Sequence, residues 1–154
     1  MIVRQHALGV AATLRSEIPG IRRVLVARTD GLPFYDDGDP ALHDSSAAVV
    51  ATVLGIAQQS GMAFGLEGLE MTTVRGPAGS MVVYAVDDHH LLAVVTEPKV
   101  NLVLLDRVVL RLIAGMVGAG PQGAGSLGSE LQGSVLQSAG TQRAVHPRPA
   151  AHAL

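Results

Sequence analysis

The chain has 154 residues, which is enough for one domain with a hydrophobic core but too few for two domains of typical size. It is 48% hydrophobic and only 16% charged, so an unusually large share of its surface has to be buried. The net charge of −2, two Phe, two Tyr and no Trp argue against a nucleic-acid-binding surface, and the absence of Cys excludes disulfides and thiolate chemistry from this sequence.

The first predicted element is a helix over residues 4–18. Apolar side chains recur there at spacings of three and four, from Ala7 to Leu14. Pro19 ends the segment, because the residue before a proline is disfavoured in the α region. The apolar pieces of this N-terminus are short and broken by polar residues, which argues against a signal peptide and predicts a cytoplasmic protein.

A β-hairpin is predicted next. Ile21 to Thr29 is rich in aliphatic and β-branched residues, and Asp30-Gly31 is typical of a tight turn. Leu32 to Tyr35 returns as a short second strand, and Pro33 within it indicates an edge of the sheet.

The acidic segment from Asp36 to His43 is predicted to be a solvated turn. Its carboxylates resemble the start of an EF-hand calcium loop, but that loop needs a Glu at its twelfth position, and the twelfth residue counted from Asp36 is Ala47. Asp36, Asp37 and Asp39 are therefore predicted to be solvated, and no metal site is expected.

The most informative segment is a predicted helix from Ser46 to about Ser60, which has apolar side chains on two faces. At 100° per residue, Val49, Val53 and Ile56 share one face. The opposite face carries Ala47, Val50, Ala51 and Leu54. A surface helix needs one apolar face to cover its own sheet, so the second face predicts a partner; a helix enclosed on both sides by its own domain is the alternative.

Membrane insertion is not expected. The longest uncharged stretch, residues 45–66, is interrupted by glycine and glutamine. Its strictly apolar part is about half of the roughly 20 residues that a membrane-spanning helix needs. This stretch is therefore predicted to be a buried helix.

Three predicted strands follow, joined as a meander by short polar turns. Their ranges are 66–76, 80–86 and 90–96. The first is polar for a strand and is predicted to be an edge, whereas the last is almost continuously apolar and is predicted to be central. An amphipathic helix beginning at Pro98 and ending near Gly118 completes the order α-β-β-α-β-β-β-α.

The composition changes after the last helix. Residues 119–154 consist mainly of Gly, Ser, Gln, Ala and Pro and lack sustained periodicity. They are predicted to be a disordered tail, which leaves residues 1–118 as the single domain.

No motif for catalysis or cofactor binding is found. His89 and His90 are adjacent, so a strand would direct them to opposite faces, where they cannot share one metal ion. The glycines that begin at Gly118 lack the Lys-Ser or Lys-Thr of a phosphate-binding loop, and Ser80 lacks the Gly-x-Ser-x-Gly motif of hydrolases. The protein is therefore expected to be non-enzymatic and to bind no cofactor.

The segments IPGIRRVLVARTDGLPFY and MTTVRGPAGSMVVYAVDDHHLLAVVTEP, together with the helices between and after them, resemble the roadblock/LC7 family over about residues 4–117. The resemblance implies a layered α/β (α+β), profilin-like fold whose five-stranded antiparallel sheet has the order 2-1-5-4-3. It also implies a homodimer formed through the third strand and the second helix. The candidate interface residues are Ala47, Val50, Ala51, Leu54, Gln58, Glu70, Thr72 and Val74.

Members of this family serve as dynein light chains, as scaffolds for GTPases or as bacterial regulators of a Ras-like GTPase, and the compact chain is similar to the bacterial regulators. The resemblance thus implies a homodimeric adaptor that binds a small Ras-like GTPase and modulates the nucleotide cycle or the location of that GTPase. A sensor-kinase signalling complex is a further setting that the resemblance implies for this adaptor. Arg28 and Arg75 are candidates for an arginine finger, although arginines in strands more often lie on the solvent face. A small-ligand sensor of profilin-like or PAS-like shape and a dynein-type structural light chain are the alternatives.

Overall fold

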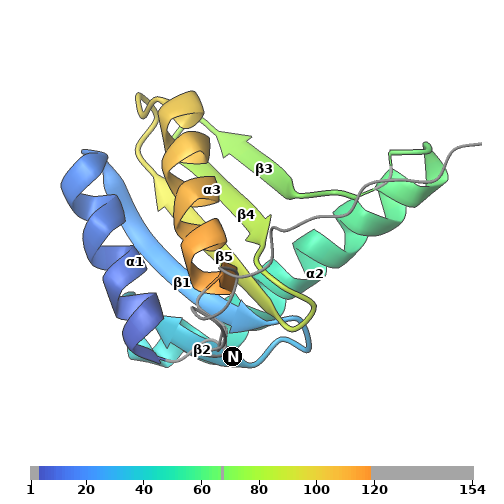
Figure 1. Cartoon of the computed structure of the whole chain (residues 1–154), viewed down its shortest axis with the longest axis horizontal. Helices are drawn as coiled ribbons and strands as arrows, with labels where there is room; N and C mark the ends of the chain where they lie inside the picture. The colour runs from blue at the N-terminus through green and yellow to red at the C-terminus, as the bar shows by residue number, and fades with distance from the viewer. Residues whose placement is uncertain (1–3, 67, 119–154) are drawn as a thin grey trace, which may run out of the picture. The chain divides into compact units, whose positions relative to one another are not determined.

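A computed structural model describes residues 4–66 and 68–118 of the chain (Figure 1). Within this range the helices and strands follow the predicted order, with a short 3₁₀ turn added before the second helix. They are α1 (Arg4–Glu17), β1 (Ile21–Arg28), β2 (Pro33–Asp36), η1 (Pro40–Leu42), α2 (His43–Ala63), β3 (Met71–Gly76), β4 (Gly79–Ala85), β5 (His90–Thr96) and α3 (Leu102–Gly118). The segment predicted as a tail, 119–154, lies outside the described residues, so that prediction stays a prediction.

The five strands form one antiparallel sheet in the order β2-β1-β5-β4-β3. β5 lies at its centre, paired with β1 on one side and with β4 on the other. β2 and β3 are the two edges. The predicted fold class, the predicted strand order and the assignment of β5 to the centre and β3 to an edge are confirmed.

Helices cover both faces of the sheet (Figure 1). α1 and α3 pack on one face, where Val24, Tyr84 and Leu92 belong to one hydrophobic cluster. α2 packs on the other face, against a second cluster that includes Leu25 and Ala93. Successive residues of a strand point to opposite faces, which is why Val24 and Leu25 belong to different clusters.

The segment between α2 and β3 differs from the prediction. α2 continues to Ala63, and the strand predicted from residue 66 begins only at Met71. Gly65 and Gly68 both have a φ of 70°, a left-handed conformation that ends the helix and is incompatible with an extended strand. Gly65 therefore ends α2, and β3 begins only beyond Gly68.

The start of α3 also differs from the prediction, which placed it at Pro98. The helix begins at Leu102. The side-chain oxygen of Asn101 accepts hydrogen bonds from the backbone N–H groups of Val103 and Leu104, both at 3.1 Å. Asn101 thus satisfies donors that have no partner within the helix, and it, rather than the proline, sets the boundary.

Candidate interaction surface

α2 packs on the sheet through the face that was predicted to form a dimer. Ala47, Val50 and Leu54 are 0%, 4% and 2% exposed and belong to the cluster that α2 shares with β1, β4 and β5. The prediction that these three side chains lie in a dimer interface was therefore wrong. Both faces of the helix are apolar, and the small Ala47, in one cluster with the strand residues Ala27 and Ala93, allows close packing on this side.

A second set of bulky side chains on α2 lies outside this core or at its margin. Val49 and Ile56 are 56% and 59% exposed, and Val53 is half-buried. With Ser60 they follow the spacing of three and four along one side of the helix, which we name the α2 flank. An apolar stripe of this kind on a single domain is characteristic of an interaction site.

The part of the sheet beside the α2 flank is also uncovered. Val74, Met81 and Val95 are register neighbours on β3, β4 and β5, and none of them is fully buried. Register neighbours point to the same face, so these three side chains form an apolar row across the sheet, which we name the sheet row. The α2 flank and the sheet row are the two walls of an open apolar groove.

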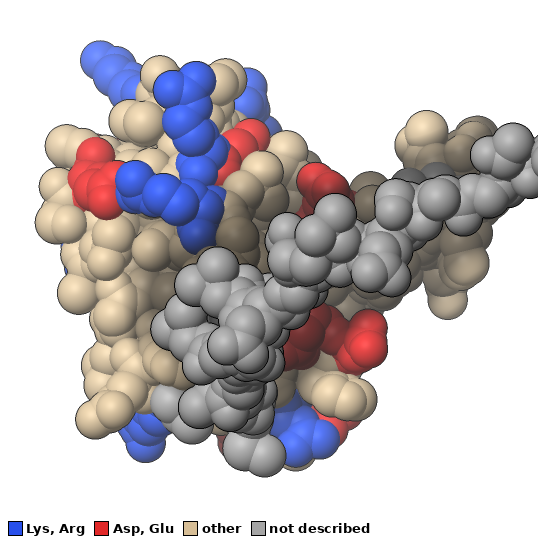
Figure 2. Space-filling model, in the orientation of Figure 1, with Lys and Arg blue, Asp and Glu red and all other residues tan. Residues whose placement is uncertain are grey.

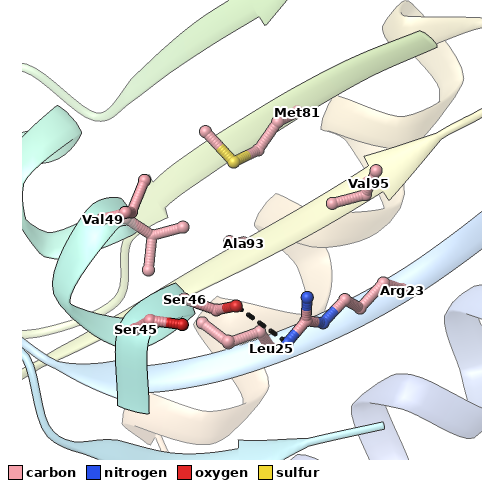
Figure 3. A pocket seen from close by; sticks show the side chains of 9 residues that line it. Arg23, Leu25, Ser45, Ser46, Val49, Met81, Ala93 and Val95 are labelled. Atoms are coloured by element: carbon pink, nitrogen blue, oxygen red, sulfur yellow. Dashed lines mark hydrogen bonds between the residues drawn. The ribbon is translucent and has the colours of Figure 1, made fainter. Parts of the chain in front are cut away.

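Near the N-terminal end of α2 the groove contains a pocket of about 200 Å³, which we name the Val49 pocket (Figure 3). Its lining is Arg23, Leu25, Ser45, Ser46, Val49, Val50, Met81, Ala93 and Val95. Apart from Arg23 and the two serines, every lining side chain is apolar. A second hollow lies further along α2 at the β3 edge, where Ile56, Phe64 and Thr72 are among its lining residues.

The other predicted interface residues are distributed over more than one surface. Thr72 lines the hollow at the β3 edge, and Val74 belongs to the sheet row, so both border the groove. Ala51 and Gln58 lie seven residues apart on the side of α2 that faces away from the groove. Glu70 is exposed just before β3. For these five residues a role in a dimer stays a prediction.

A buried ion pair fixes the start of α2 beside the groove. Arg23 donates hydrogen bonds to both carboxylate oxygens of Asp36, at 2.5 and 2.8 Å, and to the hydroxyl of Ser46 at 3.0 Å. The Asp36 side chain is fully buried and also accepts a hydrogen bond from the N–H of Gly38. Burial acts to raise the pKa of Asp36, but the hydrogen bonds from Arg23 and Gly38 outweigh it and hold that pKa below its usual value.

The acidic loop was predicted to be a solvated turn, which is wrong for two of its carboxylates. Besides Asp36, Asp37 is engaged: it pairs with Arg15 at 2.6 Å and accepts a hydrogen bond from the N–H of Val24. The partners are distant in sequence, so the composition of the loop does not reveal them. Within the part of the chain that the structure describes, no group of three or more metal-ligating side chains is present.

The two candidate arginine fingers have different surroundings. Arg28 forms an exposed ion pair with Asp30 at 2.8 Å, whereas Arg75 is exposed on the β3 edge. Figure 2, which views the side covered by α3, shows Lys and Arg interspersed with Asp and Glu among uncharged surface. On this side of the molecule the described residues carry charges of both signs and do not form a large patch of one sign.

By length and composition alone, the segment Pro40–Ala63 could cross a membrane, since it has 24 residues and a mean hydropathy of 1.3 in its most apolar stretch. Only 17% of that stretch is buried. In the structure one face of α2 packs on the sheet, as the prediction of a buried helix required, but Val49 and Ile56 of the α2 flank remain exposed. That exposed flank is the feature that a function has to explain.

Comparison with known proteins gives a family and a fold. The model of the Roadblock/LC7 domain matches residues 12–96, which is more than half of the chain. A Roadblock/LC7 domain from Streptomyces avermitilis has a TM-score of 0.66 and 18% identity, with coverage of 77% of this chain and 97% of that one.

Two further solved structures show the same fold. The gliding protein MglB from Thermus thermophilus has a TM-score of 0.64, 18% identity and coverage of 74% of this chain and 87% of its own. MglB from Myxococcus xanthus has a TM-score of 0.66, 14% identity and coverage of 75% and 94%. None of the curated proteins matches the sequence.

Proposed function

Because the chain belongs to the roadblock/LC7 family, we propose that it is a homodimeric, non-enzymatic adaptor that binds a small Ras-like GTPase. The observation that carries the proposal is the open apolar groove between the α2 flank and the sheet row. Apolar side chains that are more than half exposed in one copy, Val49 and Ile56, need a second surface to remove them from water.

A two-fold axis beside β3 accounts for both open features of the domain. Among residues 4–66 and 68–118, β3 pairs only with β4, so the N–H and C=O groups along its outer side can pair with β3 of a second copy. Two five-stranded sheets would then join into one across the axis. The same rotation brings the α2 flank of each copy into the groove of the other, so that both flanks leave water together.

The GTPase part of the proposal comes from the family. An adaptor changes the nucleotide cycle of a GTPase only if it binds one nucleotide state better than another. The dimer would supply a rigid surface for that discrimination, and the hydrolysis chemistry would remain that of the GTPase. We expect the complex to act in the cytoplasm, where a sensor kinase can be a further component.

A small-ligand sensor is the less favoured function. The Val49 pocket has a volume of about 200 Å³. The hollow at the β3 edge is larger, about 450 Å³, but Ser60 and Thr72 are the only polar side chains among the described residues of its lining. Small-molecule sites usually measure about 300–1,000 Å³ and contain a few polar groups free to orient the ligand. In the Val49 pocket Arg23 is already paired with Asp36 and Ser46, so its polar group is occupied.

Two measurements test the two parts of the proposal separately. Light scattering of the intact chain should give a mass of about twice 15.9 kDa, and a monomer at micromolar concentration would overturn the dimer. The immobilised chain is then presented with the Ras-like GTPase encoded nearest to it, loaded with GDP or with a non-hydrolysable GTP analogue. Retention of one form over the other supports the adaptor, whereas no retention of either form by an intact dimer contradicts it.

A further inference from the structure

Phe64 is an exposed aromatic side chain in a chain with only two phenylalanines. It is 81% exposed at the C-terminal end of α2. Burial of a phenylalanine removes a large apolar area from water, so an aromatic ring left in solvent is costly unless a partner covers it. This side chain lines the hollow at the β3 edge, on the same side of α2 as the groove.

The backbone holds Phe64 in a fixed position. The N–H of Leu66 donates to the carbonyl of Gly61 at 2.7 Å, and the N–H of Gly65 donates to the carbonyl of Met62 at 3.3 Å. With Gly65 at a φ of 70°, these two bonds form the Schellman motif that ends many helices, and Phe64 is its C-cap residue. The ring is therefore presented by an ordered helix end, which lowers the entropy lost on binding.

The Val49 pocket has the size and chemistry to receive such a ring. Its volume is about 200 Å³, and its lining is mainly aliphatic. An apolar cavity of about 150 Å³ is enough to hold a benzene ring. Phe64 cannot fill the pocket of its own chain, because Val49 and Phe64 are fifteen positions apart, which separates them by about 22 Å along the helix axis.

A second copy brings the two features together. In an antiparallel pair of helices related by a two-fold axis, the N-terminal half of one helix lies beside the C-terminal half of the other. Residues 49 and 64 lie opposite each other when the axis passes between Ile56 and Ala57. These two residues line the hollow beside Thr72 of β3, so they form the part of α2 next to the edge where the proposed axis runs.

From this geometry we propose that Phe64 of each copy inserts into the Val49 pocket of the other copy and anchors the dimer. The inference rests on the proposed homodimer and specifies its register. Phe64 is thus an anchor between copies of this chain rather than a docking point for a different protein. The pocket and the exposed ring are two halves of one contact that the two-fold axis repeats.

The contribution of Phe64 to association is measured by the dissociation constant of the dimer. Phe64→Ala should raise the dissociation constant of the dimer by about 30-fold or more, the effect of removing a buried aromatic anchor. Phe64→Leu, which keeps an apolar side chain, should recover part of the loss. Met62→Ala is the matched control, because Met62 is 73% exposed two residues away but lies on the opposite flank of α2; it should leave the dissociation constant within about twofold.

Cross-linking tests the register directly, since the natural chain has no cysteine. The single variants Phe64→Cys and Met81→Cys, made with different tags, are mixed, allowed to exchange subunits and oxidised. A covalent dimer containing one chain of each variant is expected, because the two sulfur atoms come within disulfide range only if residue 64 reaches the partner's pocket. Val103→Cys on α3, which is 70% exposed on the other side of the sheet, replaces Met81→Cys as the negative control.

Each other outcome overturns a defined part of the inference. Efficient cross-linking of Phe64→Cys to itself would place the two rings together at the axis and overturn the register. An unchanged dissociation constant for Phe64→Ala would overturn the anchor while leaving the proposed dimer intact. If the wild-type chain is monomeric, the dimer of the proposed function fails instead, so the two failures are distinguishable.

Discussion

Replacement of Ile56 by glutamate tests the proposed dimer at its centre. Ile56 is 59% exposed in one copy and lies where α2 meets the β3 edge. Complete burial of an isoleucine contributes about 1.5–3 kcal/mol, so covering the exposed part contributes about 1–2 kcal/mol per copy. Each dimer contains two such side chains, and the substitution also forces two like charges together without partners, at a further cost of several kcal/mol.

The sum is at least about 5 kcal/mol per dimer, which corresponds to an increase in the dissociation constant of more than about a thousandfold. The isolated domain should tolerate the change, because a substitution at a partly exposed position lowers the free energy of unfolding by about 1 kcal/mol or less. Sedimentation equilibrium should therefore show a monomer at micromolar concentration, and the far-ultraviolet circular dichroism should remain that of the folded wild-type chain.

Two further variants separate this reasoning from a general effect of charge on α2. Met62→Glu places a carboxylate on the opposite, exposed flank of the helix and should stay dimeric. Leu54→Glu places a carboxylate in a side-chain position that is 2% exposed and should unfold the domain rather than yield a folded monomer. A dimeric Ile56→Glu with wild-type affinity, or a folded monomeric Leu54→Glu, would refute the assignment of the α2 flank to the interface.

Three predictions concern the domain itself. Asp36→Asn removes the partner of the half-buried Arg23 and should lower the free energy of unfolding by about 3–5 kcal/mol in urea titrations. The pKa of Asp36 is lowered in the folded state, so its ionised carboxylate stabilises the fold above the unfolded pKa of about 4, and this stabilisation is lost as the pH falls further. On acidification the wild-type chain should therefore lose the contribution of Asp36 to the free energy of unfolding, whereas Asp36→Asn has no such contribution to lose. Burial, together with the hydrogen bond to Asp106, raises the pKa of Tyr84, so thermal stability should decline above the unfolded pKa of about 10 in the wild type and not in Tyr84→Phe. Asn101→Ala should cost about 1 kcal/mol through loss of the α3 cap, whereas Asn101→Asp should be nearly neutral.

The sequence predicts the architecture well because hydrophobic periodicity and turn residues are local signals. The continuous apolar run from Leu91 to Val94 indicates a strand buried on both faces, and β5 is indeed central. The polar character of residues 71–76 likewise indicates an edge, as found for β3. In both cases the information that decides the outcome lies within a few residues.

The features that the sequence does not predict depend on long-range packing. α2 is apolar on two sides, and periodicity cannot tell which side meets the sheet; that choice is decided by the fit of Ala47, Val50 and Leu54 to strands that are distant in the sequence. Asp36 similarly has the character of a turn residue in the sequence, and only the pairing of β1 with β2 brings its carboxylate within hydrogen-bond distance of Arg23. For this reason the exposed apolar side of α2 is the side opposite to the one predicted for the interface.

The two edges of the sheet are unequal, and this inequality favours β3 as the edge that associates. β2 spans four residues, begins with Pro33, which has no N–H to donate, and is distorted by a register shift between Val26 and Ala27 of β1. Such features are those by which proteins prevent pairing at an exposed edge. β3 spans six residues from Met71 to Gly76 without a proline and pairs with β4 in continuous register, so its outer side remains a regular ladder of donors and acceptors. An open groove next to the only unprotected edge within the described residues is the arrangement that a two-fold dimer requires, and it is why the α2 flank and β3 belong to one interface rather than two.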